Sequence, residues 1–283
     1  MALPRLVLKG AGNMDGHTVI FGYIAVYAAL TAGVRPVYKL LIDTERYNRA
    51  MRDRYHSREK RRYDSLKKLT QNIDWLTPEE FSALPGSAGA GGMAAEVGER
   101  HFLSPEALLN KKNAYIVLLD GIEDPYNFGY VLRTLYVSGV DGVLLPERNF
   151  FSASDTVIRS SAGASEFLDI AISQDLASVV MLAKKAGFRI ISTAASSSAV
   201  SLREAGISRP LCLLIGGEKR GISKKLMALS DTVIRIDYPR ACPMSLSASA
   251  AANILAYEVG SAVLPPDDTG RLSDYNRLSH AEH

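Results

Sequence analysis

Cysteine is scarce in this chain, which excludes the classes of protein that depend on it. Cys212 and Cys242 are the only two cysteines among 283 residues, and they do not form a CxxC pair. Two cysteines are too few for a disulfide framework and lack the spacing of a zinc ligand set. We therefore expect a reducing, cytoplasmic setting. The five histidines form no ligand-spaced cluster either, so we expect no metal site.

Long hydrophobic runs are also missing. The most apolar N-terminal stretch, residues 18–30, has 13 residues, whereas a membrane-spanning helix needs about 20. Two interpretations stay open for it: a buried core helix, which the poor lead-in at residues 10–17 favours, and the apolar part of a signal peptide. Because 47% of the residues are apolar, the chain can bury a sizeable core in one large or two modest domains.

Neither sign of charge is in large excess overall, but the charge is unevenly placed. The net charge is only +3, yet residues 45–68 hold ten Lys or Arg against four Asp or Glu. No Gly or Pro interrupts this segment, which predicts one helix with its three tyrosines near one stripe. It is either a solvated helix packed on its own domain or a contact surface for phosphate groups. The predicted contact residues are Arg58, Lys60, Arg61 and Arg62.

The first 100 residues are predicted to form a small α/β unit. We expect a helix over 17–31, strands over 37–42 and 73–76 on either side of the basic helix, and then a short helix. Thr77, Pro78 and Glu80 have the spacing of a capping box with proline at the first helical position. Residues 86–92 have almost no side chains to pack, which indicates a linker or a loop that needs positive φ.

From residue 114 onward, short apolar runs alternate with amphipathic segments, which is a βαβ pattern. Runs that are apolar on both faces predict a parallel sheet covered on both sides. The predicted strands are 115–119, 142–145, 189–193, 211–215 and 233–236, and the helical segments between them include 130–137, 176–185 and 223–229. The end of the chain, from residue 263, is polar.

Common catalytic signatures are absent: there is no GxxxxGK[ST], GxSxG, HExxH or strand-to-helix GxGxxG. Three segments instead follow predicted strands, at the edge where open α/β sheets bind ligands. They are 119–139, 213–227 and 244–253. In the first, Asn127 and Arg133 either belong to a site or are structural, with Asn127 capping the helix and Arg133 paired with Glu123 or Asp124.

Together these segments resemble the SpoU/TrmH-type RNA methyltransferases of the SPOUT superfamily. Residues 127–133 (NFGYVLR) resemble the family's first motif, NxGxxxR; residues 215–221 (IGGEKRG) resemble the second, and residues 245–252 (SLSASAAA) the third. Residues 159–164 (RSSAGA) resemble a further family segment, and Arg159 joins the predicted RNA contacts. Residues 17–42 and 91–97 resemble the two ends of a small ribosomal-protein-like domain.

The resemblance implies an α/β protein of two domains: an RNA substrate-binding domain at 1–100, a linker at 101–113, a SPOUT domain at 114–262 with a mostly parallel sheet and a deep trefoil knot, and a tail at 263–283. It implies S-adenosylmethionine bound in the knot, no metal, and a homodimer with composite active sites. The implied cofactor contacts are Thr193, Ala194, Gly216, Gly217, Gly221, Ile236, Ser245 and Leu246.

The implied reaction is methyl transfer to a ribose 2′-hydroxyl of structured RNA, with ribosomal RNA slightly favoured over transfer RNA. Arg133 then either activates the hydroxyl or clamps the target phosphate, oriented by Asn127 and Glu218. Ser247 stands where the family usually has asparagine. Three interpretations follow: an active enzyme with rearranged contacts at Ser247, altered target chemistry, or an RNA-binding relative that transfers nothing.

Overall fold

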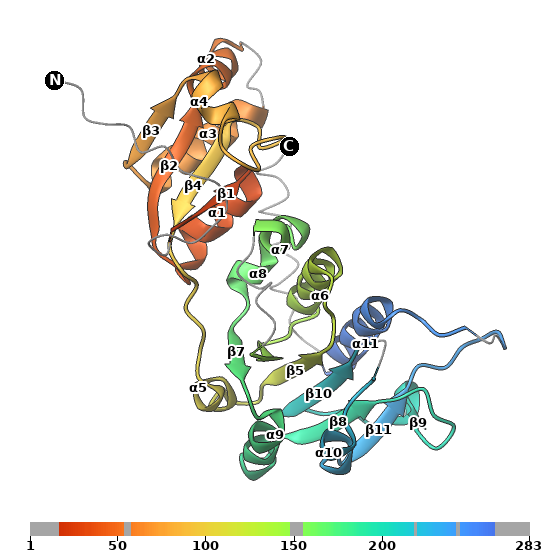
Figure 1. The fold of residues 1–283 in the computed structure, drawn as a ribbon. Helices are drawn as coiled ribbons and strands as arrows, with labels where there is room; N and C mark the ends of the chain where they lie inside the picture. The colour runs from red at the N-terminus through yellow and green to blue at the C-terminus, as the bar shows by residue number, and fades with distance from the viewer. Residues whose placement is uncertain (1–16, 54–57, 148–154, 218–219, 242–243, 264–283) are drawn as a thin grey trace. The chain divides into compact units, whose positions relative to one another are not determined.

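The computed structural model divides into two compact units, Met1–His101 and Phe102–His283 (Figure 1). It describes residues 17–53, 58–147, 155–217, 220–241 and 244–263. Each unit has its own sheet. Among the described residues, no helix is long and apolar enough to cross a membrane.

The first unit is a mixed four-stranded sheet in the order β1-β4-β2-β3, with β2 antiparallel to β4 and parallel to β3. Ile20, Leu40, Ile42 and Ala95 are completely buried in it. The strands are β1 (Thr18–Phe21), β2 (Val37–Asp43), β3 (Ile73–Leu76) and β4 (Met93–Val97); the helices are α1 (Tyr23–Ala32), α2 (Thr44–Arg52), α3 (Arg58–Leu69) and α4 (Pro78–Ser82).

Two predictions for this unit are wrong. The helix expected over 17–31 begins only at Tyr23, because residues 18–21 form β1 and pair with β4, a strand that the sequence did not reveal. The single basic helix is two helices, α2 and α3; residues 54–57, with Tyr55, lie outside the described residues. The capping box at α4 is confirmed, and so are positive φ angles in the glycine loop, at Gly86, Gly89, Gly91 and Gly92.

The second unit is a seven-stranded, all-parallel sheet in the order β7-β6-β5-β10-β8-β11-β9, which confirms the predicted fold class. Strands β7 and β9 were not predicted. Helix α5 lies in the stretch predicted as a linker, with Leu108 and Leu109 buried. The strands are β5 (Tyr115–Asp120), β6 (Gly142–Pro146), β7 (Ile170–Ser173), β8 (Arg189–Thr193), β9 (Val200–Ser201), β10 (Leu211–Gly216) and β11 (Thr232–Arg235). The helices are α5 (Pro105–Leu109), α6 (Pro125–Val137), α7 (Asp155–Ser160), α8 (Ala164–Phe167), α9 (Leu176–Lys185), α10 (Lys224–Ala228) and α11 (Ala248–Ala262).

Both faces of this sheet are covered, which explains its uniformly apolar strands. Successive side chains of a strand point to opposite faces, so Tyr115, Val117 and Leu119 join one core, with α6 and α11, while Ile116 and Leu118 join the other, with α9. In the sheet, β10 lies between β5 and β8, whereas in the sequence it follows both of them. The loops after β5, β10 and β8 therefore emerge side by side at the carboxyl edge. The trefoil knot stays a prediction.

Helix α6 packs closely against α7 because position 129 has no side chain. A Cβ atom on Gly129 would lie 1.9 Å from Oγ of Ser160. We expect Gly129→Ala to lower the free energy of unfolding by about 2 kcal/mol, since overpacking forces neighbouring groups to move. Urea unfolding measures this change. Adding Ser160→Ala removes the nearest atom and restores part of the loss; an unchanged unfolding midpoint in Gly129→Ala contradicts this packing.

Candidate functional site

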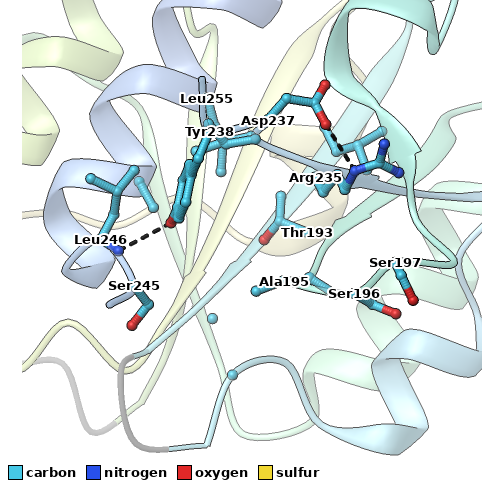
Figure 2. A pocket seen from close by; sticks show the side chains of 16 residues that line it. Thr193, Ala195, Ser196, Ser197, Arg235, Asp237, Tyr238, Ser245, Leu246 and Leu255 are labelled. Carbon is cyan, nitrogen blue, oxygen red and sulfur yellow. Dashed lines mark hydrogen bonds and ion pairs between the residues drawn. The ribbon is translucent and has the colours of Figure 1, made fainter. Parts of the chain in front are cut away.

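A cavity of about 430 Å³ opens at the carboxyl edge of the second sheet (Figure 2). It lies where β8, β10 and β11 end and where α11 begins, the position at which open α/β sheets bind ligands. Its volume is in the range of small-molecule sites. Its lining residues are Thr193, Ala194, Ala195, Ser196, Ser197, Gly216, Gly221, Ile234, Arg235, Ile236, Asp237, Tyr238, Ser245, Leu246, Ala251 and Leu255.

Glycines let two loops meet beside this cavity. A Cβ on Gly217 would lie 2.4 Å from the carbonyl oxygen of Gly121, and a Cβ on Gly216 would lie 2.2 Å from the carbonyl carbon of Gly221. The loop after β10 also turns back on itself, with the Gly221 N–H donating to the Gly217 carbonyl at 2.9 Å. The backbone of this loop, rather than its side chains, therefore borders the cavity.

Two charged side chains of the cavity wall bind each other. Nε of Arg235 donates to Oδ1 of Asp237 at 2.8 Å (Figure 2). Ser201 also donates to Asp237, and Arg235 donates to the carbonyl of Ala199, so the pair ties β9 to the end of β11. The hydrogen bond from Ser201, followed by the charge of Arg235, holds the pKa of Asp237 below its usual value. The carboxylate is therefore ionised at neutral pH.

Tyr238 holds the loop that precedes α11. The N–H of Leu246 donates to the Tyr238 hydroxyl at 3.1 Å, and both residues line the cavity (Figure 2). Arg235, Asp237 and Tyr238 were not predicted from the sequence. The available signal was their position directly at the end of a predicted strand.

The predicted cofactor residues come together, with one exception. Thr193, Ala194, Gly216, Gly221, Ile236, Ser245 and Leu246 all line the cavity, whereas Gly217 does not. Gly217 instead makes the close backbone contact with Gly121. Three strand ends and one helix start thus contribute to the same wall, although up to 53 residues separate them in sequence.

The predicted catalytic residues lie on helices rather than in the cavity wall. Helix α6 is capped by Asp124, whose carboxylate accepts from the Asn127 N–H at 2.8 Å; the interpretation of Asn127 as the cap is therefore wrong. Arg133 is exposed, and among the described residues it has no ion pair, so its pairing with Glu123 or Asp124 is also wrong. Glu218 lies outside the described residues.

Ser247 caps α11. Its hydroxyl accepts from the N–H of Ala250 at 3.2 Å, and Leu246, the residue before it, lines the cavity. Serine and asparagine are comparably good helix caps. The departure from the family's asparagine therefore leaves the start of α11 intact.

The predicted RNA contacts are spread around α3 rather than gathered on one side. Arg62 lies 5.1 Å from the ring centre of Tyr23 in α1, and Arg58, one turn earlier, shares that side. Lys60 lies on the opposite side, towards α2, two turns before Lys67. Arg159, on α7, forms an ion pair with Asp155 at 3.5 Å.

Metal and thiol chemistry find no support in the part of the chain that the structure describes. Its histidines, cysteine and carboxylates form no group of three that could hold a metal ion. Cys212 is buried in the sheet, and burial raises the pKa of its thiol to about 12. A ligand at the carboxyl edge would instead contact backbone groups, hydroxyls and apolar side chains.

A parallel sheet with a cavity at its carboxyl edge is the architecture of the α/β proteins that bind a ligand at that edge. Residues 114–257 match the SpoU rRNA Methylase family. This match spans half of the chain and includes every lining residue, and the chain belongs to that family of RNA methyltransferases.

Relatives and solved structures extend the similarity. A TrmH family protein of Staphylococcus saprophyticus is 34% identical over 178 residues, covering 59% of this chain and 69% of that protein. One from Staphylococcus aureus is 29% identical, covering 86% and 95%. The SpoU methyltransferase AviRb from Streptomyces viridochromogenes, solved with AdoMet, has a TM-score of 0.69 at 20% identity over 93% of this chain and 95% of its own. An RNA 2′-O ribose methyltransferase has a TM-score of 0.65 at 21% identity, covering 87% and 88%.

The capping role of Ser247 predicts how its variants behave. Ser247→Ala should lower the free energy of unfolding by about 1 kcal/mol, because the Ala250 N–H loses its acceptor, whereas Ser247→Asn should stay within about 0.5 kcal/mol of the parent. Denaturant unfolding checks both. Equal losses in the two variants would contradict the capping role.

The contact between Tyr238 and Leu246 predicts a specific effect on ligand affinity. Tyr238→Phe removes the acceptor and should weaken S-adenosylmethionine binding about fivefold, since a hydrogen bond contributes about 1 kcal/mol. Isothermal titration calorimetry measures the affinity. Tyr27→Phe, a change in the first unit, is the control and should bind like the parent; a Tyr238→Phe protein with parental affinity would contradict the role given to this contact.

Proposed function

We propose that this chain transfers a methyl group from S-adenosylmethionine to a ribose 2′-hydroxyl of structured RNA, with ribosomal RNA favoured over transfer RNA. The observation that carries the proposal is the cavity in which the segments resembling the second and third motifs meet. The preference for ribosomal RNA follows the family description alone.

The lining residues fit S-adenosylmethionine. Ile234, Ile236, Leu246 and Leu255 offer apolar surface to a flat base, while the backbone groups of Gly216 and Gly221 offer hydrogen bonds. This combination of apolar walls and a few polar groups is typical of cofactor sites. Bound S-adenosylmethionine would supply the methyl group from its sulfonium and leave as S-adenosylhomocysteine, while the hydroxyl proton passes to water. The chain itself has to bind the donor and align the hydroxyl with it.

Arg133 acts on the RNA as a positioning and charge-stabilising group. A guanidinium keeps its proton in proteins and is therefore a poor base, but its planar fork fits a phosphate. Clamping the target phosphate fixes the hydroxyl, and the positive charge stabilises the alkoxide that develops. Asn127 and Glu218 orient this arginine, as the family resemblance implies.

A second copy of the chain completes the site. Tyr126, Tyr130, Arg133 and Val137 follow one another along one exposed stripe of α6, with Val137 72% exposed. Helix α11 packs beside α6 and exposes Ile254 and Tyr257. An apolar face of this kind is typical of an interface. A homodimer formed through these helices covers the face and brings Arg133 to the partner's cavity.

Radiolabelled methyl transfer to total RNA from cells that lack the gene tests the reaction. We expect label in dinucleotides that resist alkali, because a 2′-O-methyl group blocks cleavage, and we expect it in ribosomal rather than transfer RNA. Label in alkali-sensitive nucleotides contradicts ribose methylation. Absence of label, with S-adenosylmethionine binding intact, identifies an RNA-binding relative that transfers nothing.

Mixed dimers test the composite site. Arg133→Ala should lower methyl transfer at least ~100-fold without weakening donor binding, and Ala251→Phe should fill the cavity and abolish donor binding. Mixing the two inactive proteins after unfolding and refolding should restore about one quarter of the parental activity, since half of the dimers then carry one complete site. Each variant refolded alone is the control. If the mixture stays inactive, Arg133 does not serve the partner's cavity.

A further inference from the structure

The chain's single tryptophan is exposed on the first unit. Trp75 lies on β3, the edge strand of the four-stranded sheet, and is 44% exposed. It pairs in register with the buried Ile42, so it belongs to the sheet face of Ile42. An exposed indole at a fixed strand position is a flat apolar surface open to a ligand.

The indole has rigid neighbours. Tyr47 of α2 meets it edge-on, with ring centroids 4.7 Å apart, and Tyr63 of α3 meets Tyr47 in turn at 5.3 Å. Tyr63 is completely buried and donates from its hydroxyl to the Gly91 carbonyl at 3.1 Å. A buried side chain thus anchors the row, which holds Trp75 in place before any ligand binds.

A cation lies beside this row of aromatic rings. Nζ of Lys67 donates to the Tyr47 hydroxyl at 2.8 Å and lies 5.1 Å from the centre of that ring. Helices α2 and α3 together carry nine Lys or Arg against three Asp or Glu. An aromatic face beside cations fits an unpaired nucleotide, whose base stacks while its phosphates meet the positive charge. A protein strand added to β3 would find only four residues to pair with.

We propose that Trp75, supported by Tyr47 and Lys67, stacks an unpaired nucleotide of the RNA substrate. This inference rests on the proposed function for the identity of the substrate, and it adds a base contact to a surface otherwise expected to meet phosphates. Stacking tolerates any base, so the cluster selects single-stranded over paired RNA rather than one sequence.

Because Trp75 is the only tryptophan, its fluorescence reports the contact directly. We expect an eight-nucleotide oligoadenylate to quench the emission of the full-length protein, and a blunt duplex of equal length to quench it far less. Trp75→Ala should weaken binding of the labelled oligonucleotide about tenfold, whereas Trp75→Phe should retain most of it. Tyr38→Ala, which removes an exposed aromatic side chain at the start of β2, is the control and should bind like the parent.

Two results overturn this inference. Unchanged tryptophan emission while the labelled oligonucleotide binds, or equal affinity of the parent and Trp75→Ala, shows that no base stacks there and leaves the indole to a protein contact. If the Trp75→Ala protein still transfers a methyl group to RNA, the proposed function is unaffected by either result. A parent protein that neither binds RNA nor transfers a methyl group to it overturns this inference and the proposed function together.

Discussion

A backbone contact that leaves no room for side chains determines the site. The loop after β10 lies against the loop after β5 at Gly217 and Gly121, and a Cβ atom on either glycine would meet the other backbone within 3 Å. Beside this contact, Gly216 and Gly221 of the same loop line the cavity, and neither has a side chain. The glycines thus shape the cavity wall by their packing.

In the second unit, the cavity and the predicted catalytic side chains lie on different elements. Strand ends and the start of α11 build the cavity, where Tyr238 and the Arg235–Asp237 pair fix the loops around it. Helix α6 instead carries Asn127 and Arg133 outside the cavity wall. The proposed composite site of a dimer requires a cavity in one chain and an exposed arginine on an apolar helix face of the other.

The sequence predicted the elements whose signal is local. Strands buried on both faces, such as β5 and β10, read as apolar runs, and the capping box of α4 depends on residues only three apart. Strand β9 was missed because it has only two residues, whereas β7 was missed although it is as long as the predicted β3. The end of α2 at Arg52 is marked by neither Gly nor Pro. The family resemblance predicted most of the cofactor residues that line the cavity. Tyr238 was missed because its contact with Leu246 depends on how two loops fold together.

A crystal structure of the chain with S-adenosylhomocysteine tests the central claim most directly. We expect one molecule per chain at the carboxyl edge, with its adenosine between the glycines Gly216 and Gly221 and the loop of Ser245 and Leu246, and in contact with Ile236. A ligand bound elsewhere, or a cavity that stays empty at saturating concentration, would contradict it.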